Sequence, residues 1–422
     1  MIDQIFSMKN TKIEIKATLP EHRILSIDLL RGFAVLGILI MNIQNFSMIG
    51  AAYINPAAYG DLAGINRWVW IFSHIFADSK FMSLFSMLFG VGIIIFTERV
   101  LEKGRRAGPL HYRRNFWLLV FGMIHAYTIW SGDILVTYSL CAFLAFVFRK
   151  KKPRTLIIAS VLFFIVPIVF LIGVGQMVAD WPKDAYNQNM ESWLPEQEKI
   201  DHELTAMQGN WMDQMEIRVE SSIFMQTFLF FWQSFWRVMS MMLLGMALYK
   251  WSIITAQRST QFYIKMVVIS FVIGISIIGV GVIQNFQHQW LMDYSMFTGA
   301  VYNYVGSVGI ALGYMALVML LAKSVKANGF KQLMSSVGKM AFTNYILMSI
   351  VCSFIFYGHG LGLFGKVERF EQILIVIGVW IIILIISPLW LKKYQYGPLE
   401  WLWRVLTYWR IQPMKKVSKS AV

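Results

Sequence analysis

Apolar runs long enough to cross a membrane recur along the whole chain, separated by short polar segments. A spanning α-helix needs about 20 mostly apolar residues, because every backbone group must be hydrogen-bonded inside lipid. The pattern therefore predicts an all-α polytopic membrane protein, a bundle of about ten transmembrane helices. The expected spans are 29–48, 80–97, 115–131, 133–148, 155–178, 222–249, 263–284, 299–322, 338–357 and 371–391.

Lysine and arginine alternate between the two ends of these spans. With the N-terminus inside, the cytoplasmic segments hold 30 of the 38 basic residues, and Lys80 is among the few on the other side. Because basic residues accumulate in the cytoplasm, we expect both termini there. The domains are then a cytoplasmic N-terminal segment, 1–25, a transmembrane domain, 26–391, and a cytoplasmic interfacial tail, 392–422.

Composition agrees with a multi-pass protein of the cell membrane, since 57% of the residues are hydrophobic and 14% charged. The net charge of +15 needs no nucleic acid, because a basic cytoplasmic face meets anionic membrane lipids. The two cysteines, Cys141 and Cys352, lie in apolar segments, which excludes a disulfide framework and a zinc site; no metal is expected.

Two segments lie outside the spans. The extracytoplasmic loop 179–221 carries 10 acidic and 3 basic residues and is either a lid or a solvated connection. The cytoplasmic tail contains "GPLEWLWRVLTYWR", whose tryptophans suit a helix anchored at the membrane interface.

His125 and Asp133 interrupt an apolar stretch that has basic clusters at both ends. Each limb has about 16 residues, or about 24 Å of helix against about 30 Å of hydrocarbon. We therefore expect a recessed pocket that opens outward, with Asp133 in its floor and His125 deeper. In the alternative interpretation, His125 bonds a neighbouring helix and Asp133 caps the fourth span.

Polar residues on other spans should face the same interior. Asp28, Arg31 and Asn42 share one face of the first helix, and Arg237 lies near the middle of the sixth. Arg237 is too deep to reach water easily, so it should have an anionic partner or a hydrated cavity. Alternatively, Asp28 and Arg31 form only an ion pair at the start of a helix, and Arg237 only a structural pair.

Several motifs together resemble those of the bacterial YeiB-type membrane proteins, a domain of unknown function. They are "RILSIDLLRGFAVLGILIMNI", "FMSLFSMLFGVG", "RRNFWLLVFGMIHAYTIWSGDILVTYSL", "GKMAFTNYILMS" and "GPLEWLWRVLTY". The resemblance implies membership of the transmembrane acyltransferases, which include heparan-alpha-glucosaminide N-acetyltransferase. Such a protein takes an acyl group, with acetyl expected, from cytoplasmic acyl-CoA and delivers it to a surface glycan or small-molecule acceptor.

The chain departs from its lysosomal relatives, which place a histidine shortly after the first span. Here none follows Asn42 until His74, so His125 becomes the expected base, with Asp133 as its partner. The expected oxyanion donors are Asn42, Asn344 and Tyr345. The residues expected to bind the CoA phosphates are Arg31, Arg105, Arg106, Arg113 and Arg114.

Two other classes of protein fit the same features. A secondary transporter would also need a deep arginine, a titratable histidine and interrupted helices. A non-catalytic membrane scaffold or sensor is the third alternative. Stabilisation by acyl-CoA would distinguish an acyltransferase from both, whereas the sequence leaves the acceptor and a possible homodimer open.

Overall fold

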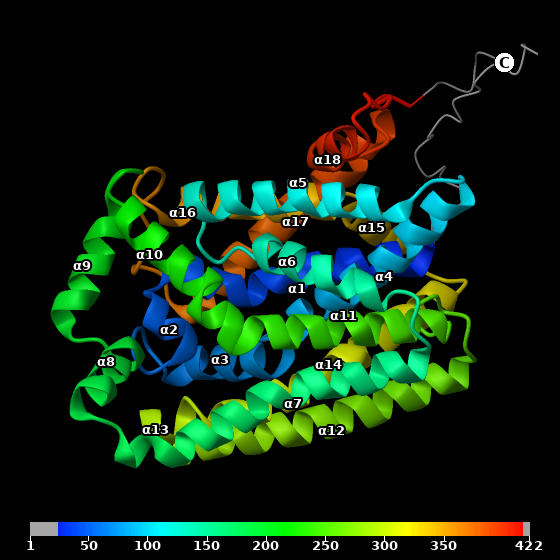
Figure 1. Ribbon diagram of the computed structural model, residues 1–422. Helices are drawn as coiled ribbons and strands as arrows, with labels where there is room; N and C mark the ends of the chain where they lie inside the picture. Colours follow the sequence, from blue (N-terminus) through cyan, green and yellow to red (C-terminus); the bar gives the residue numbers. More distant parts are fainter. Residues whose placement is uncertain (1–23, 417–422) are drawn as a thin grey trace, which may run out of the picture.

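The computed structural model describes residues 24–416, and α-helices make up most of this part of the chain. Over those residues there is no strand, only an isolated bridge between Tyr394 and Lys415. The expected segment 1–25 lies almost wholly outside the described residues, as does the end of the tail, 417–422. The long helices run alongside one another in one bundle (Figure 1).

Within residues 24–416, six stretches are long and apolar enough to cross a membrane. They contain α1 (Leu25–Ser47), α3 (Gly64–Phe76) together with α4 (Lys80–Glu102), α7 (Pro153–Met177), α12 (Thr260–Gln287), α14 (Thr298–Lys323) and α17 (Arg369–Lys393). A seventh span exists if α15 (Asn328–Lys339) and α16 (Ala341–Phe356), which are bent by 78° at Met340, are counted together. The chain is therefore a helical membrane protein.

The other three expected spans are also helical, but they are short or partly polar. These helices are α5 (Ala107–Thr128), α6 (Leu135–Phe148), α10 (Met215–Gln226) and, after a π-helical turn at Phe230–Ser234, α11 (Phe235–Lys250). Helix α6 has only 14 residues, and the second turn of α5 carries Arg113 and Arg114. The count of ten spans and the cytoplasmic termini stay predictions.

Helix α1 lies in the middle of the bundle, between α4, α15 and α16, whereas α7 and α12 form one edge (Figure 1). Leu30 and Val35 of α1 are fully buried. The edge helices instead expose apolar side chains such as Ile158 and Val268. Since apolar exposure of this kind is stable in lipid, these helices face the membrane.

Glycines allow α4 and α11 to approach closely. A Cβ atom at Gly90 would lie 2.0 Å from the Met242 carbonyl oxygen, and one at Gly245 would lie 2.1 Å from that of Met87. Both positions therefore require glycine. Helix pairs in lipid are held by such close packing, because apolar surface alone does not drive them together.

The loop 179–221 covers one end of the bundle with α8 (Lys183–Trp193), α9 (Gln197–Gln208) and α10 (Figure 1). It is anchored there, since Gly358 N donates to Met207 O over 3.0 Å and Gln208 Nε2 to Phe364 O over 2.7 Å. The loop is thus a packed cover. Helix α18 (Pro398–Tyr408) lies toward the other end.

Candidate functional site: a buried histidine–aspartate pair beside a basic cavity

The turn between α5 and α6 brings His125 and Asp133 together. Gly122 lies where the two helices approach, and a Cβ atom there would come within 2.7 Å of Val136 N. The approach places Asp133, just before α6, beside His125 in the last turn of α5. The distance from His125 Nδ1 to Asp133 Oδ2 is 2.7 Å, and each side chain is 1% exposed.

Both oxygens of Asp133 have partners. Oδ2 faces His125 Nδ1, and Oδ1 accepts a hydrogen bond of 2.8 Å from Val136 N in the first turn of α6. Asp133 can therefore be the partner of His125 through Oδ2 and the cap of α6 through Oδ1. Because an ionised carboxylate only accepts, His125 Nδ1 carries a proton and Nε2 offers its lone pair.

His125 Nε2 is buried and has no hydrogen-bond partner within residues 24–416. Burying a polar atom without a partner costs about 1–3 kcal/mol, so such atoms are rare and often mark a functional group. The imidazole is enclosed by aromatic rings, with the Tyr345 centroid at 5.2 Å and the Trp130 centroid at 6.2 Å. Trp130 in turn stacks on Phe46 at 4.2 Å. The site is therefore dry, and the nitrogen is held ready for a proton.

A cavity of about 330 Å³ ends beside this pair. Its inner end is formed by Ile134, Leu135, Tyr138 and Tyr345. His125 packs against Tyr345, which lines the cavity, whereas His125 itself is not part of the lining described. The apolar middle section is lined by Phe85, Leu88, Phe89, Ile93, Phe96, Leu110 and Leu118.

The other end of the cavity is basic. Its cationic lining comes from five different helices or their flanks and consists of Arg31, Arg99, Lys103, Arg105, Arg114, Lys339 and Arg404. The acidic residues in the lining are Asp28 and Glu400. All of these residues belong to segments whose basic charge predicts the cytoplasmic side. The excess of positive charge suits an anionic ligand.

Helix α18 forms one wall of this cavity. Trp403 Nε1 donates to Arg114 O over 2.8 Å, and the Arg114 guanidinium lies 4.4 Å from the Trp403 ring centroid. Glu400 accepts hydrogen bonds from Phe342 N at 2.7 Å and from Thr343 Oγ1 at 2.6 Å, at the start of α16. Burial raises the pKa of the Glu400 carboxyl. The tail helix, predicted only as an anchor, thus lines the cavity.

Five of the residues predicted for the site meet at this cavity. Asp28 and Arg31 are paired at 3.2 Å at its basic end, where Arg105 and Arg114 also lie. Tyr345 closes its inner end, and its hydroxyl accepts a hydrogen bond of 3.3 Å from Ile134 N.

Four others lie elsewhere. Arg106 is exposed before α5, and the Arg113 guanidinium lies 4.8 Å from the Trp409 ring centroid. Asn344 donates to Val337 O at 3.1 Å and to Ser387 Oγ at 3.0 Å, which ties α16 to α15 and α17. Asn42 is half-buried in α1. The cavity lining, as described for residues 24–416, includes none of these four.

The expected recess that opens outward is wrong. The His125 and Asp133 side chains are almost completely enclosed, and the neighbouring cavity runs toward the basic flank of α5. The prediction assumed a limb of about 16 residues, whereas α5 extends through its basic flank to 22 residues, about 33 Å. The longer α5 extends to the basic end of the cavity, so the histidine–aspartate pair is enclosed by protein instead of lying in an open recess.

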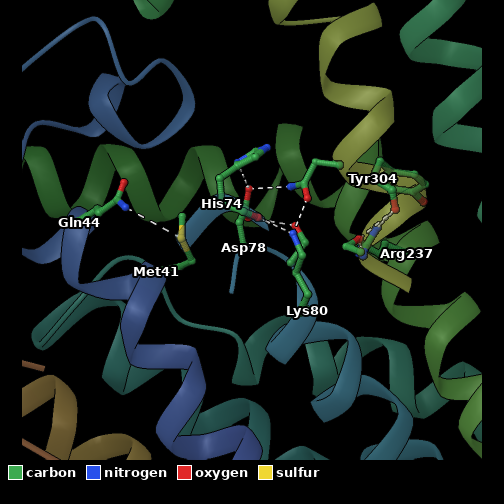
Figure 2. A network of polar contacts seen from close by, with 10 residues as sticks. Met41, Gln44, His74, Asp78, Lys80, Arg237 and Tyr304 are labelled. Carbon is green, nitrogen blue, oxygen red and sulfur yellow. Dashed lines mark hydrogen bonds and ion pairs between the residues drawn. The ribbon is translucent and has the colours of Figure 1, made fainter. Parts of the chain in front are cut away.

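Arg237 belongs to a second polar cluster, shown in Figure 2 with His74, Asp78 and Lys80. Its guanidinium donates from Nη1 to Tyr304 O at 2.9 Å, and from Nη2 to the hydroxyls of Ser83 and Ser307 at 2.9 and 2.6 Å. The expected anionic partner is thus replaced by neutral acceptors, and Arg237 is not part of the cavity lining given above.

Sequence reasoning missed the burial of Lys80 and gave no specific role to Asn45. Lys80, counted as a charge outside the membrane, is completely buried. Asn45 Oδ1 accepts a hydrogen bond of 2.8 Å from Trp130 Nε1 and so holds that ring near His125. One signal was available for Lys80, because Ser83 and Ser86 follow it at helical spacing and are buried with it.

A helical membrane protein with a buried histidine–aspartate pair beside a basic cavity is the class that these observations define. The family model described as "Protein of unknown function (DUF418)" matches residues 248–410. "Uncharacterized protein YxaH" of Bacillus subtilis is 33% identical over 96% of this chain and 99% of its own length. "Uncharacterized protein YeiB" of Escherichia coli is 30% identical over 92% and 96%, respectively.

The chain therefore belongs to this family of YeiB- and YxaH-type proteins. A third relative, "Uncharacterized 39.9 kDa protein in amylase 3'region" of Bacillus acidopullulyticus, is 26% identical over 93% of this chain and 96% of its own length. No solved structure matches the chain.

Proposed function

We propose that this protein is an acyltransferase of the cell membrane. It moves an acyl group, acetyl in the simplest case, from cytoplasmic acyl-CoA to a hydroxyl or amine of a glycan or small-molecule acceptor. The resemblance to transmembrane acyltransferases suggests the reaction. The observation that carries the proposal is the unpartnered His125 Nε2, which lies one side chain away from a cavity with a basic entrance.

The cavity suits the donor in both charge and shape. The phosphates of CoA are anionic, and arginine is the residue best suited to bind them. The cationic end offers Arg105 and Arg114 for this purpose, and the apolar middle section can hold the uncharged pantetheine arm. The volume of about 330 Å³ lies at the lower end of the range of about 300–1,000 Å³ for ligand pockets. The thioester would then lie at the inner end, near Tyr345.

The chemistry follows from the protonation of His125. The acceptor oxygen or nitrogen forms a bond to the thioester carbonyl carbon while His125 Nε2 takes the acceptor's proton. The C–S bond then breaks, and the thiolate of CoA leaves with that proton. Asp133 stabilises the imidazolium that forms in between and fixes its orientation.

Tyr345 has two parts in this proposal. Its hydroxyl oxygen already accepts from Ile134 N, so its proton is available for the oxyanion of the thioester carbon. The ring also separates the cavity from His125, and it must turn aside for the acceptor to reach Nε2.

The test is stabilisation of the purified protein by acetyl-CoA. Micromolar to millimolar acetyl-CoA should raise the melting temperature, whereas pantetheine, which lacks the nucleotide phosphates, should raise it less. Release of free thiol from acetyl-CoA in the presence of membrane extracts then measures transfer. No stabilisation by acetyl-CoA at any of these concentrations would exclude the proposed donor.

The cavity must also open to the cytoplasm, where acyl-CoA is found. A cysteine at Lys103, which lines the basic end, should be labelled by an impermeant maleimide in inside-out vesicles and not in intact cells. Labelling from outside intact cells would contradict this orientation.

A proton-coupled transporter is the second candidate. The breaks between α3 and α4 and between α15 and α16 favour it, because interrupted helices surround the binding sites of many transporters. Such a protein should not respond to acetyl-CoA, so the same stabilisation measurement separates the two candidates.

A further inference from the structure

The second polar cluster lies at the break between α3 and α4. Ser79, in this break, has a φ of 65°, which is uncommon for a residue with a side chain. Directly after the break, Phe81 packs so closely on Gly37 that a Cβ atom there would lie 2.0 Å from its ring. Gly37 lies next to the midpoint of α1 (Leu25–Ser47). The break is therefore near the middle of the bundle.

Asn303 of α14 joins two ionisable side chains of this cluster, Asp78 and Lys80, which are labelled in Figure 2. Its Oδ1 accepts from Lys80 Nζ at 2.6 Å, and its Nδ2 donates to Asp78 Oδ2 at 2.7 Å. Lys80 Nζ also donates to the His74 carbonyl oxygen at 2.5 Å. Asp78 further pairs with His74 Nδ1 at 3.2 Å and accepts from Ser79 Oγ at 3.1 Å. Within residues 24–416, both hydrogen bonds of Lys80 are thus to neutral acceptors.

The charges in this cluster do not balance when all its groups are ionised. Arg237 is 2% exposed and always carries its proton, and its Nε has no partner among the described residues. Lys80 and Arg237 would then supply two positive charges, and a protonated His74 a third, against the single carboxylate of Asp78. An excess charge is expensive in a medium of low dielectric constant. With His74 as a neutral imidazole and Lys80 as a neutral amine, Arg237 and Asp78 balance each other.

The contacts of Lys80 fit an amine. A neutral amine has two N–H donors and a lone pair, and Lys80 Nζ has two acceptors, Asn303 Oδ1 and the His74 carbonyl. We propose that this cluster is a proton-binding centre within the membrane, in which Lys80 alternates between amine and ammonium. A proton taken from water forms the third N–H bond at the Nζ lone pair and adds one positive charge, and its release to water reverses the step.

A proton from water would reach Lys80 from the side on which His74 and Asp78 lie. Lys80 itself is 0% exposed, whereas the side chains of His74 and Asp78 are 16% and 19% exposed. This pair therefore connects the centre with water. The ionisable groups that face the cluster from the packed helices are His74, Asp78, Tyr53, Tyr138, Arg237 and Tyr304. Proton exchange at mid-membrane is a function separate from acyl transfer, and it is what proton-coupled membrane proteins require.

Two substitutions of Lys80 test the centre without any acyl donor. Lys80→Met removes the proton site and two hydrogen bonds but keeps the length and the charge balance, so it should lower the melting temperature at about pH 8 by less than about 5 °C. Lys80→Arg makes the charge permanent and should lower it by more than about 5 °C. The opposite order, with Arg tolerated and Met destabilising, overturns the proposal.

The pH dependence supplies a second readout. Unfolded lysine keeps its proton to about pH 10. If folded Lys80 is an amine, the unfolded chain binds more protons, and the melting temperature of the wild type should rise from about pH 6 to about pH 9. Lys80→Met should lose part of this increase of melting temperature with pH, whereas His74→Gln should keep it. An equal increase in wild type and Lys80→Met would contradict the proposed proton-binding centre. If Lys80→Met fails to fold, Lys80→Gln, neutral with two N–H donors, replaces it, and its failure also overturns the proposal.

Discussion

Residues 24–416 hold two histidine–aspartate pairs that differ in how many hydrogen-bond partners surround them. His125 and Asp133 are 2.7 Å apart and each 1% exposed, and His125 Nε2 has no partner among the described residues. His74 and Asp78 are 3.2 Å apart and partly exposed. The second pair is also joined to other polar groups through Asn303 and Lys80.

This difference indicates two kinds of chemistry. A dry imidazole with one free nitrogen, next to a cavity, is suited to remove a proton from a bound substrate. A partly exposed pair in a network that contains a buried lysine is suited to exchange protons with water. The same two residue types therefore have different expected roles, and mutations should separate them.

The largest difference should appear between His125→Ala and His74→Ala. Loss of a positioned base typically costs about 10²- to 10⁴-fold in rate, so His125→Ala should abolish most transfer while acetyl-CoA still stabilises the protein. His74→Ala should leave turnover within about threefold of the wild type, because His74 is not part of the cavity lining described. Turnover and melting temperature are measured on the same preparations. Normal turnover in His125→Ala would exclude the catalytic role.

Asp133→Asn should come next, at about 10²-fold. The carboxylate accepts from His125 Nδ1 at one oxygen and from Val136 N at the other. An amide has one acceptor oxygen, so its NH₂ group must face one of these donors and disturb the histidine tautomer or the helix start. Asp78→Asn is the matched control, and it should leave transfer intact. A loss below about threefold in Asp133→Asn would show that the pair does not set the tautomer.

Arg237→Leu should act on stability more than on turnover. The substitution removes three hydrogen bonds and leaves the hydroxyls of Ser83 and Ser307 with fewer partners, at an expected cost of about 2–4 kcal/mol. Arg237→Lys keeps the charge but not the forked geometry, so it should recover part of the loss. Thermal unfolding of the wild type, Arg237→Lys and Arg237→Leu measures whether stability decreases in that order. Equal stability of Leu and wild type would mean that these hydrogen bonds contribute nothing.

The sequence predicted the pair of His125 and Asp133 but not the cluster of His74, Asp78 and Lys80, and the difference has a physical reason. His125 and Asp133 lie eight residues apart, on either side of a turn between two apolar segments. If both segments are helices, the turn between them places the two side chains close together. Lys80 was misplaced because no glycine or proline marks the break before it. Ser79 takes the left-handed conformation there, and only the packing of α14 and α11 around the break shows that Lys80 is buried.

Tertiary contacts also decided which arginines reach the cavity. Arg105 and Arg106 are neighbours in the sequence, and only Arg105 lines the cavity as described. Their difference depends on the direction in which the chain enters α5, which composition cannot show. The wall made by α18 was missed for a similar reason, because the apolar face of that helix suits a membrane surface as well as a protein surface.

Arg105 and Arg106 give a matched pair of variants for the cavity next to His125. Arg105→Gln should weaken acetyl-CoA binding about tenfold, which corresponds to the loss of one phosphate contact of about 1.4 kcal/mol. Arg106→Gln should have almost no effect, because its side chain is exposed outside the lining. Titration of the stabilisation by acetyl-CoA measures both. Equal effects of the two variants would mean that the arginines act only through the general positive field.

The smallest expected effect concerns Glu400, which joins α18 to the start of α16. Glu400→Ala removes the acceptor for Phe342 N and Thr343 Oγ1 and should destabilise the protein by about 1 kcal/mol, as the loss of a helix cap does.

Because burial raises the pKa of the Glu400 carboxyl, the folded state holds its proton more tightly than the unfolded state. Its contribution to stability is therefore largest at low pH and falls as the pH rises above about 4.5, the ordinary value. Glu400→Gln should remove this fall, and melting curves from about pH 4 to about pH 8 measure it. A wild-type slope that is unchanged in Glu400→Gln would assign the pH dependence to another group.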